Sequence, residues 1–247
     1  GGAPLPTPIA KVFIGLGLNL VQGYGLTETS PILSGNPPDD NVPASVGIPL
    51  EGIELRIGEH DELLARGPVV MLGYWNNQEA TDAVIDSDGW FHTGDKARIE
   101  NNHVYITGRL KEIIVLANGE KAPPADMEMA IALDTLFEQV MVVGDGRPYL
   151  SALLVLNPEQ WVDIADSLQL DSEDPESLKS GTFEKLVCEK VAARLTEFPG
   201  YARILKVTCT LEPWTIENEL ITPTLKLKRN RIMEYYSSAL ENMYEGH

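Results

Sequence analysis

The middle of this chain carries a β-hairpin pattern between two glycine turns, and this pattern constrains the fold more than any other segment. The first turn is Thr93-Gly94-Asp95, after which Ala97–Glu100 and His103–Ile106 alternate in polarity as paired strands do. The Asn101-Asn102 corner between them suits a turn that needs positive φ. Gly108 follows the hairpin, and we predict that it marks the break between two structural units.

Before this break, proline and glycine cut the chain into short segments. Ile53–Ile57 and Glu62–Arg66 alternate as half-buried strands do, which predicts a small β-rich subdomain over about residues 43–108. A strand is expected at Leu18–Gln22. It is expected to end in a turn at Gly23-Tyr24-Gly25, where glycine on both sides lets the backbone approach a ligand.

After the break, helical and extended patterns alternate, which predicts an α+β unit. The expected helices are Pro124–Leu133, Trp161–Leu168, Phe183–Leu195 and Arg229–Tyr244. The expected strands are Glu112–Leu116, Val140–Val143, Leu150–Leu156 and Ile204–Leu211. The predicted fold class is therefore α/β with a β-rich subdomain, divided into residues 1–108 and 109–247.

Composition excludes some classes of function. The 247 residues are 43% hydrophobic, enough for a buried core, and the formal net charge of -18 argues against nucleic-acid binding. Cys188 and Cys209 form neither a disulfide framework nor a metal-ligand spacing, so both are expected to be reduced thiols of a cytoplasmic protein. The longest apolar stretch, Val12–Val21, is too short to span a membrane, and the sequence shows no secretory signal.

Three groups of polar residues are candidates for nucleotide binding. Tyr24-Gly25-Leu26-Thr27-Glu28 supplies an aromatic face, a hydroxyl and a carboxylate, which suit a base, a phosphate and a metal ion. The alternative for this segment is a strand end with an N-cap-like Thr-Glu pair. Asp95 suits two ribose hydroxyls, or it simply caps a turn. The guanidinium of Arg109 suits ribose and phosphate oxygens, or it belongs to an ordinary surface arginine.

The histidines show no signature of nucleophilic catalysis. His92 is expected to be a packed or surface residue, and His60, His103 and His247 have no partners at a nucleophilic spacing. We therefore predict neither a Ser-His-Asp nor a Cys-His site.

Three separated motifs, in this order, resemble the adenylate-forming (AMP-binding) superfamily, and above all the long-chain fatty-acid CoA ligases. They are Tyr24–Glu28, the run Asp88–Lys121, and Pro223–Arg229. The resemblance implies that residues 1–108 are the C-terminal remainder of the large AMP-binding domain, including a β-barrel-like part. It implies that residues 109–247 are the small mobile C-terminal domain.

The resemblance also implies roles for individual residues. Tyr24 would stack on adenine, Thr27 would contact the α-phosphate, and Glu28 would help to hold Mg²⁺. Asp95 would bind the ribose and Arg109 the nucleotide. The remaining nucleotide contacts would come from the backbones of Gly2, Ala3 and Gly25.

The C-terminal part carries the residues that the resemblance links to domain movement and catalysis. Lys111 occupies the hinge position, and Gly119 lies in a segment that resembles the family's mobile glycine loop. The catalytic lysine would be Lys226, with Lys228 as the nearest rival. Many family members have glycine where this chain has Leu225.

The resemblance implies an ATP-dependent fatty acyl-CoA synthetase, an AMP-forming acid-thiol ligase that uses fatty acid, ATP with Mg²⁺, and coenzyme A. Nothing in the chain matches the family's upstream phosphate loop, so we expect a C-terminal fragment that is inactive without the N-terminal part of the same enzyme. One alternative is a fatty acyl-AMP ligase that loads a carrier protein. The short segment between Glu28 and Asp95 leaves little room for the insertion typical of such ligases. Another alternative is a non-catalytic nucleotide-binding module. A peripheral membrane contact is left open.

Overall fold

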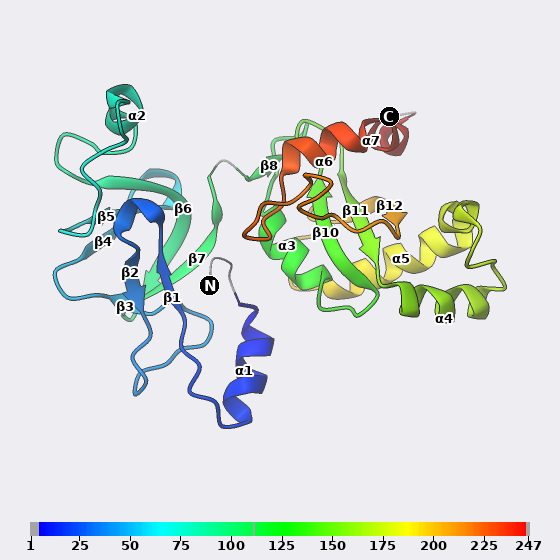
Figure 1. The fold of residues 1–247 in the computed structure, drawn as a ribbon, viewed down its shortest axis with the longest axis horizontal. Coiled ribbons are helices and arrows are strands. Elements are labelled where there is room, and N and C mark those ends of the chain that lie inside the picture. Colours follow the sequence, from blue (N-terminus) through cyan, green and yellow to red (C-terminus); the bar gives the residue numbers. More distant parts are fainter. Residues whose placement is uncertain (1–4, 111, 246–247) are drawn as a thin grey trace. The chain divides into compact units, whose positions relative to one another are not determined.

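The computed structural model describes residues 5–110 and 112–245. Contacts between Cα atoms divide the chain into two compact units, residues 3–111 and residues 112–247, which we call unit 1 and unit 2 (Figure 1). Each unit is described by itself. The boundary predicted from the sequence, after residue 108, lies three residues before this division. The domain roles assigned from the sequence remain predictions.

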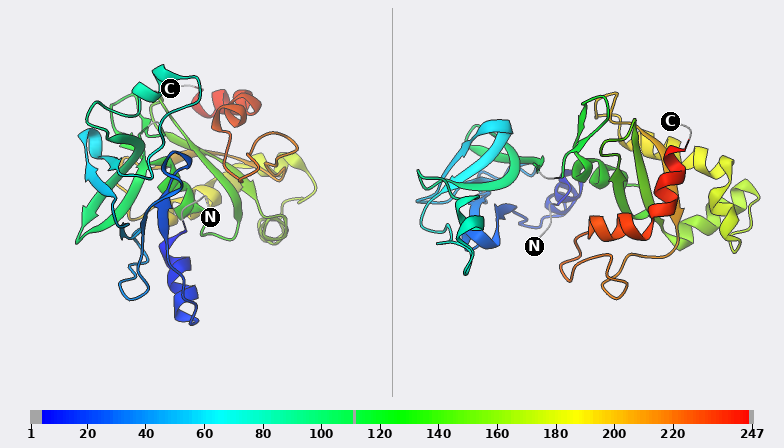
Figure 2. Two further views of the ribbon diagram at one scale, coloured as in Figure 1. Left: turned by 60° about the vertical axis from the view of Figure 1, so that its left-hand side comes forward. Right: turned by 90° about the horizontal axis from the view of Figure 1, so that it is seen from above.

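Unit 1 contains two antiparallel sheets. The first has three strands in the order β1 (Gly23–Gly25), β2 (Ile32–Gly35) and β3 (Ile48–Pro49). The second is a curled sheet with the order β4 (Glu54–Ile57), β5 (Glu62–Arg66), β6 (Phe91–Glu100) and β7 (His103–Arg109) (Figure 2). The helices are α1 (Thr7–Gly15), α2 (Gln78–Asp82) and two short 3₁₀ helices, Thr27–Thr29 and Glu59–Asp61.

The predicted hairpin is confirmed and is longer than its sequence pattern. Strands β6 and β7 pair antiparallel, and the Asn101 and Asn102 corner has φ of 49° and 67°. Asparagine tolerates this left-handed region better than most residues, which explains the corner. Small apolar clusters pack on the sheet, and the half-buried ring of Tyr24 contacts two of them.

The strand predicted at Leu18–Gln22 is wrong. Those residues have no regular structure, and the strand is Gly23–Gly25, where the sequence suggested a turn. The glycines explain the shift, because a Cβ atom at Gly25 would lie 1.7 Å from the carbonyl oxygen of Pro31. Only glycine lets β1 approach its neighbour this closely.

Unit 2 is built on a three-stranded sheet in the order β10 (Phe137–Val143), β11 (Leu150–Leu156) and β12 (Ile204–Thr210). Strands β10 and β11 are antiparallel, whereas β11 and β12 are parallel. The parallel pair needs a long crossover, which α4 (Pro158–Leu168), the 3₁₀ helix Pro175–Lys179 and α5 (Gly181–Arg194) provide. The other elements are β8 (Ile114–Val115), β9 (Lys121–Ala122), α3 (Pro124–Ile131), α6 (Arg229–Tyr235) and α7 (Ser237–Tyr244).

Every residue of β11 is buried, because helices cover both faces of the sheet. Leu150, Ala152 and Leu154 belong to the core that also includes residues of α3, α4 and α5, whereas Leu153 and Val155 pack with α6 and α7. Figure 2 shows α5 and the α6–α7 pair on opposite sides of this sheet. Burying each leucine or valine contributes roughly 1.5–3 kcal/mol, so this strand is the centre of unit 2.

Most predicted elements of unit 2 are confirmed, with two corrections. The helix expected at Arg229–Tyr244 is two helices that meet at Tyr236, whose ring packs edge-on against Trp214. The strand expected at Glu112–Leu116 is only Ile114–Val115, because its partner β9 has two residues. Across the described residues, no helix is long and apolar enough to cross a membrane.

Candidate nucleotide site

Tyr24, Asp95 and Arg109 form a hydrogen-bonded group in unit 1. The hydroxyl of Tyr24 donates to Oδ2 of Asp95 over 2.5 Å, and Nε of Arg109 lies 3.1 Å from Oδ1 of the same carboxylate. The two strands create the second contact, because Asp95 on β6 lies directly opposite Arg109 on β7. The structure therefore brings together three of the residues that the sequence linked to nucleotide binding.

Short contacts with β5 fix the backbone around Asp95. The hydroxyl of Thr93 donates to the carbonyl oxygen of Leu63 over 2.7 Å, and Asp95 N donates to that hydroxyl over 3.1 Å. Gly94, with φ of 72°, donates its N–H to Oε1 of Glu62 over 2.9 Å. The Thr-Gly-Asp segment is therefore a bent part of β6 held on both sides, and Asp95 does not end a turn.

The electrostatics of this group favour a fixed carboxylate with an accessible cation. The side chain of Asp95 is 6% exposed, whereas that of Arg109 is 48% exposed. Burial, followed by the nearby Asp95 charge, raises the pKa of the Tyr24 hydroxyl well above its ordinary value, so tyrosine remains a donor at neutral pH. A carboxylate offers about four lone-pair sites, which is enough to accept from vicinal hydroxyls as well as from tyrosine.

The 3₁₀ helix Thr27–Thr29 presents Glu28 directly after β1. Buried Thr29 holds this helix, because its hydroxyl accepts from Leu26 N over 2.9 Å and donates to the Pro31 carbonyl oxygen over 2.9 Å. Oε1 of Glu28 accepts a 2.9 Å bond from the hydroxyl of Tyr74. Thr27 is exposed, so its hydroxyl is accessible to a ligand.

Glu28 fits the way in which proteins bind Mg²⁺ together with a nucleotide. Over residues 5–110 and 112–245 there is no group of three or more acidic, histidine or cysteine side chains suited to a metal ion. Mg²⁺ in nucleotide sites commonly has one or two carboxylate ligands, with phosphates and water completing its shell. A single carboxylate near an exposed hydroxyl is compatible with that chemistry.

In unit 2, exposed Lys226 lies at the end of a small hairpin loop. The backbone N–H of Thr222 donates to the Lys226 carbonyl oxygen over 2.8 Å, and Lys226 N donates to the Thr222 hydroxyl over 3.0 Å. Leu225 precedes it with φ of 62°. The loop ends at Arg229, which begins α6 and is clamped by Glu128 at 2.7 Å.

Gly119 also belongs to unit 2, where it lies in the exposed turn between β8 and β9 with φ of 87°. Gly2, Ala3 and Lys111 lie outside the described residues. Tyr24, Asp95 and Arg109 thus contact one another in unit 1. Gly119 and Lys226 lie in exposed loops of unit 2.

A histidine network is present that the sequence did not indicate. His103 Nδ1 lies 3.0 Å from the hydroxyl of Ser45, and Nε2 lies 3.1 Å from Oδ2 of Asp40. The expectation from the sequence that His103 has no serine or aspartate partner is therefore wrong. The backbone N–H of Val46 donates to the Val104 carbonyl oxygen and that of Val104 to the Gly47 carbonyl oxygen, both over 2.9 Å. These bonds bring His103 on β7 to a distant loop, which no local spacing could reveal. Ser45 is 1% exposed, so this Ser-His-Asp group has no access to a substrate and joins the loop to the hairpin.

The sequence also missed two supporting residues of the site, Tyr74 and Glu62. Tyr74 contacts Glu28, and Glu62 accepts from both Gly94 N and, over 2.8 Å, His92 Nδ1. Their distance from the motifs along the chain explains why the sequence gave no signal.

Comparison with known proteins identifies the relatives of this chain. The family model described as AMP-binding enzyme matches residues 1–75, and the AMP-binding enzyme C-terminal domain matches residues 111–247. Long-chain-fatty-acid–CoA ligase FadD15 of Mycobacterium bovis is 35% identical over 260 residues, covering 99% of this chain and 41% of that protein. The long-chain-fatty-acid–[acyl-carrier-protein] ligase AEE15, chloroplastic, of Arabidopsis thaliana is 32% identical, covering 99% of this chain and 35% of that protein.

A solved structure shows the same fold. The A domain of carboxylic acid reductase from Segniliparus rugosus, in complex with AMP and a co-purified carboxylic acid, matches with a TM-score of 0.79 and 23% identity. The match covers 98% of this chain and 38% of that one, and it confirms the predicted fold class. The chain thus spans roughly two fifths of the length of these relatives. Because the C-terminal-domain model alone matches more than half of the chain, this protein belongs to the AMP-binding enzyme family, as its three motifs predicted.

Proposed function

We propose that the protein carrying this chain is an ATP-dependent fatty acyl-CoA synthetase. The observation that carries the proposal is the Tyr24–Asp95–Arg109 group, which occurs in a chain of the AMP-binding enzyme family. The name of the FadD15 relative supports fatty acid as substrate and CoA as acceptor. In this reaction the fatty-acid carboxylate attacks the α-phosphate of ATP and releases pyrophosphate. The CoA thiol then attacks the acyl carbon and releases AMP.

The residues of unit 1 supply nucleotide recognition in this proposal. Asp95 accepts from the ribose hydroxyls, and Arg109 contributes positive charge close to them. The ring of Tyr24 provides a surface for adenine, beside the backbone of Gly25. The family motif assigns further adenine contacts to Gly2 and Ala3, which lie outside the described residues. Thr27 donates to the α-phosphate and Glu28 binds the Mg²⁺ that neutralises the phosphates.

Lys226 and Gly119 of unit 2, with Lys111 at the end of unit 1, supply the steps that differ between the two half-reactions. The exposed ammonium of Lys226 neutralises charge that gathers on the α-phosphate during adenylation. Rotation about Lys111 replaces it with the loop of Gly119 for thioester formation. This assignment of Lys226, Lys111 and Gly119 rests on the family motifs.

Substitution of Lys226 tests the proposal directly. In the protein at its natural length, Lys226→Ala is expected to abolish fatty-acid-dependent exchange of pyrophosphate into ATP, while thioester formation from supplied acyl-AMP survives. Lys228→Ala is the matched control and is expected to keep both half-reactions. If Lys226→Ala retained exchange and Lys228→Ala lost it, the catalytic lysine would be Lys228.

Carrier-protein loading is the second candidate, and the name of the AEE15 relative favours it. Acyl-AMP formation would be the same, but a phosphopantetheine thiol on a carrier protein would replace CoA as acceptor. Supplying the enzyme with acyl-AMP and either CoA or a phosphopantetheine-loaded carrier protein separates the two. Faster thioester formation on the carrier would overturn the choice of CoA.

Calorimetric titration of the 247-residue chain with AMP separates the two enzyme candidates from a non-catalytic module whose nucleotide pocket is damaged. A complete pocket gives saturable binding that Asp95→Ala abolishes, whereas a damaged pocket gives no binding. The cytoplasmic location expected from the sequence stays a prediction.

A further inference from the structure

We propose that Tyr74 is a positioning residue for Glu28, an inference that rests on the proposed function. Its hydroxyl donates to Oε1 of Glu28 over 2.9 Å. Over residues 5–110 and 112–245 this is the one hydrogen bond that the Glu28 carboxylate accepts, and Oε2 accepts none there. Tyr74 therefore holds one oxygen of the carboxylate and leaves the other for Mg²⁺.

A second contact joins the same two segments. The backbone N–H of Met71 donates to the carbonyl oxygen of Glu28 over 2.7 Å. The loop before α2 thus contacts Glu28 through both its backbone and the Tyr74 side chain. Two bonds of this kind restrict the position of the 3₁₀ helix and the rotation of the carboxylate it carries.

The backbone of Tyr74 is itself fixed from the opposite side. Its N–H donates to the hydroxyl of Thr81 over 2.9 Å, and that hydroxyl donates to the carbonyl oxygen of Asn77 over 2.9 Å. Thr81 is buried, and Gly73 packs so closely on it that a Cβ atom there would lie 2.8 Å from Cγ2 of Thr81. A continuous set of contacts therefore runs from α2 to the Glu28 carboxylate.

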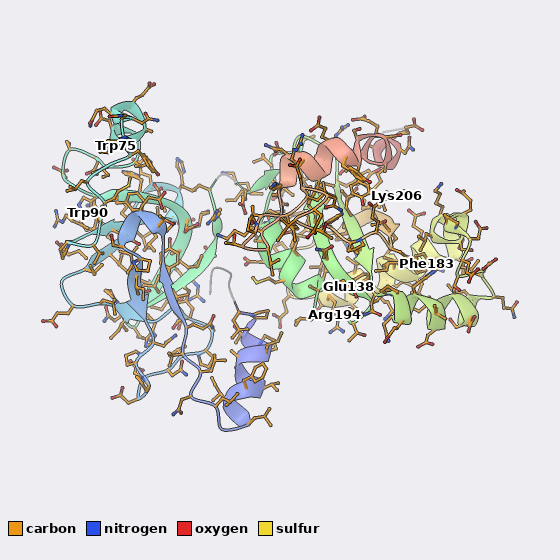
Figure 3. The ribbon with its side chains drawn as sticks, viewed as in Figure 1. Trp75, Trp90, Glu138, Phe183, Arg194 and Lys206 are labelled. Atoms are coloured by element: carbon orange, nitrogen blue, oxygen red, sulfur yellow. The ribbon has the colours of Figure 1, made fainter. Side chains whose placement is uncertain are left out.

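The neighbours of Tyr74 show that its orientation is specific. Leu72 is fully exposed, and Trp75, labelled in Figure 3, is 91% exposed. Tyr74 is the aromatic of this loop that contacts Glu28, and it does so through its hydroxyl. That hydroxyl donates to the carboxylate and so restricts its orientation, as hydrogen-bond partners of metal-binding carboxylates do.

Calorimetric titration with ATP, without fatty acid, tests the role of Tyr74 in the protein at its natural length. The measured quantity is the ratio of the ATP dissociation constant in EDTA to that in excess Mg²⁺, which needs no turnover. Tyr74→Phe keeps the ring and removes the hydroxyl. It is expected to lower this ratio about three- to tenfold. Loss of a buried hydrogen-bond partner of a metal ligand would have a larger effect, but Tyr74 is partly exposed. ATP binding in EDTA should stay within twofold of wild type.

A double variant distinguishes positioning from general structural damage. If Tyr74 acts through Glu28, Glu28→Gln with Tyr74→Phe binds Mg·ATP as Glu28→Gln does. Tyr235→Phe is the matched control, because the hydroxyl of Tyr235 also donates to a glutamate, Glu212, over 3.2 Å. It is expected to leave the ratio unchanged.

The outcomes separate this inference from the proposed function. The positioning role alone would be overturned if Tyr74→Phe kept the wild-type ratio. It would also be overturned if the fold-loss in Mg·ATP affinity of the double variant equalled the product of the fold-losses of the two single variants. If Glu28→Gln kept the wild-type ratio, Glu28 would not be a Mg²⁺ ligand, and Tyr74 would have no positioning role. Failure of the wild-type protein to bind Mg·ATP would instead overturn the proposed function.

Discussion

The hydroxyl of Tyr24 donates to Oδ2 of Asp95 over 2.5 Å, although the two residues are 71 apart in the sequence. The family resemblance gave Tyr24 only an aromatic face for adenine. The structure gives it a second task, because its hydroxyl fixes the carboxylate that would bind the ribose. In the proposed function, one side chain would thereby join base and ribose recognition.

Removal of that hydroxyl is expected to weaken AMP binding. Tyr24→Phe retains the ring but deprives a buried carboxylate of a donor, an effect of about 1–1.5 kcal/mol or roughly a tenfold rise in the dissociation constant. Calorimetry with AMP measures it. Tyr105→Phe, on the same hairpin, is the control and should bind as wild type does. Equal affinity for Tyr24→Phe would show that the bond to Asp95 plays no part in recognition.

Local sequence patterns predicted those elements whose apolar residues recur within one short segment. Phe183, Val187 and Val191 recur at helical spacing, and all three are fully buried on α5. β11 was likewise predicted with its correct bounds, because it is an apolar run between turn residues. The strand at Gly23–Gly25 was not predicted. Its glycines are required by the close approach of a neighbouring segment, which no local pattern shows.

The same limit applies to the site. Tyr24 and Asp95 were found because each lies in a recognisable motif, but the bond between them depends on how β1 and β6 pack. Tyr74 and His103 were missed for the same reason, since their partners come from remote segments. Sequence motifs therefore predict candidate site residues, and the fold determines which of these candidates contact one another.

A change at Leu225 is expected to stabilise unit 2. Leucine in the left-handed region is strained by roughly 1–2 kcal/mol, and this side chain is 72% exposed, so it contributes little apolar burial. Asparagine tolerates this conformation without the backbone freedom that glycine adds to the unfolded chain. Leu225→Asn should raise the free energy of unfolding by about 0.5–1 kcal/mol. Urea unfolding measures this, and a lower stability would contradict the strain.

The buried His103 network is expected to be structural. His103→Ala removes partners from Ser45 and Asp40 and should lower the free energy of unfolding by about 1–3 kcal/mol. A fluorophosphonate probe should leave Ser45 unlabelled in the wild-type protein, because that serine is buried. Lys11→Ala, at an exposed residue of α1, is the control for stability. Labelling of Ser45 that depends on His103 would instead indicate a nucleophile.

The pH dependence of unit 2 should reflect Asp126 at the start of α3. Burial raises the pKa of Asp126 from its ordinary 3.8 to about 6. Between these values the unfolded chain loses this proton before the folded chain does, so the contribution of Asp126 to stability falls as pH rises from about 4 to 6. Asp126→Asn should remove that fall, a gain on the order of 1 kcal/mol at pH 7 after allowing for solvent screening.

Glu217 offers a control of opposite sign for the Asp126 measurement. Hydrogen bonds from its own backbone N–H and from Thr215 lower the pKa of Glu217, so its stabilisation is present above its ordinary pKa and is lost as pH falls. Glu217→Gln should therefore lower the stability at pH 7, whereas Asp126→Asn should raise it. Urea unfolding at several pH values, followed by hydrogen exchange of the β11 amides, measures both. A pH profile of Asp126→Asn parallel to that of wild type would show that Asp126 does not ionise with a raised pKa.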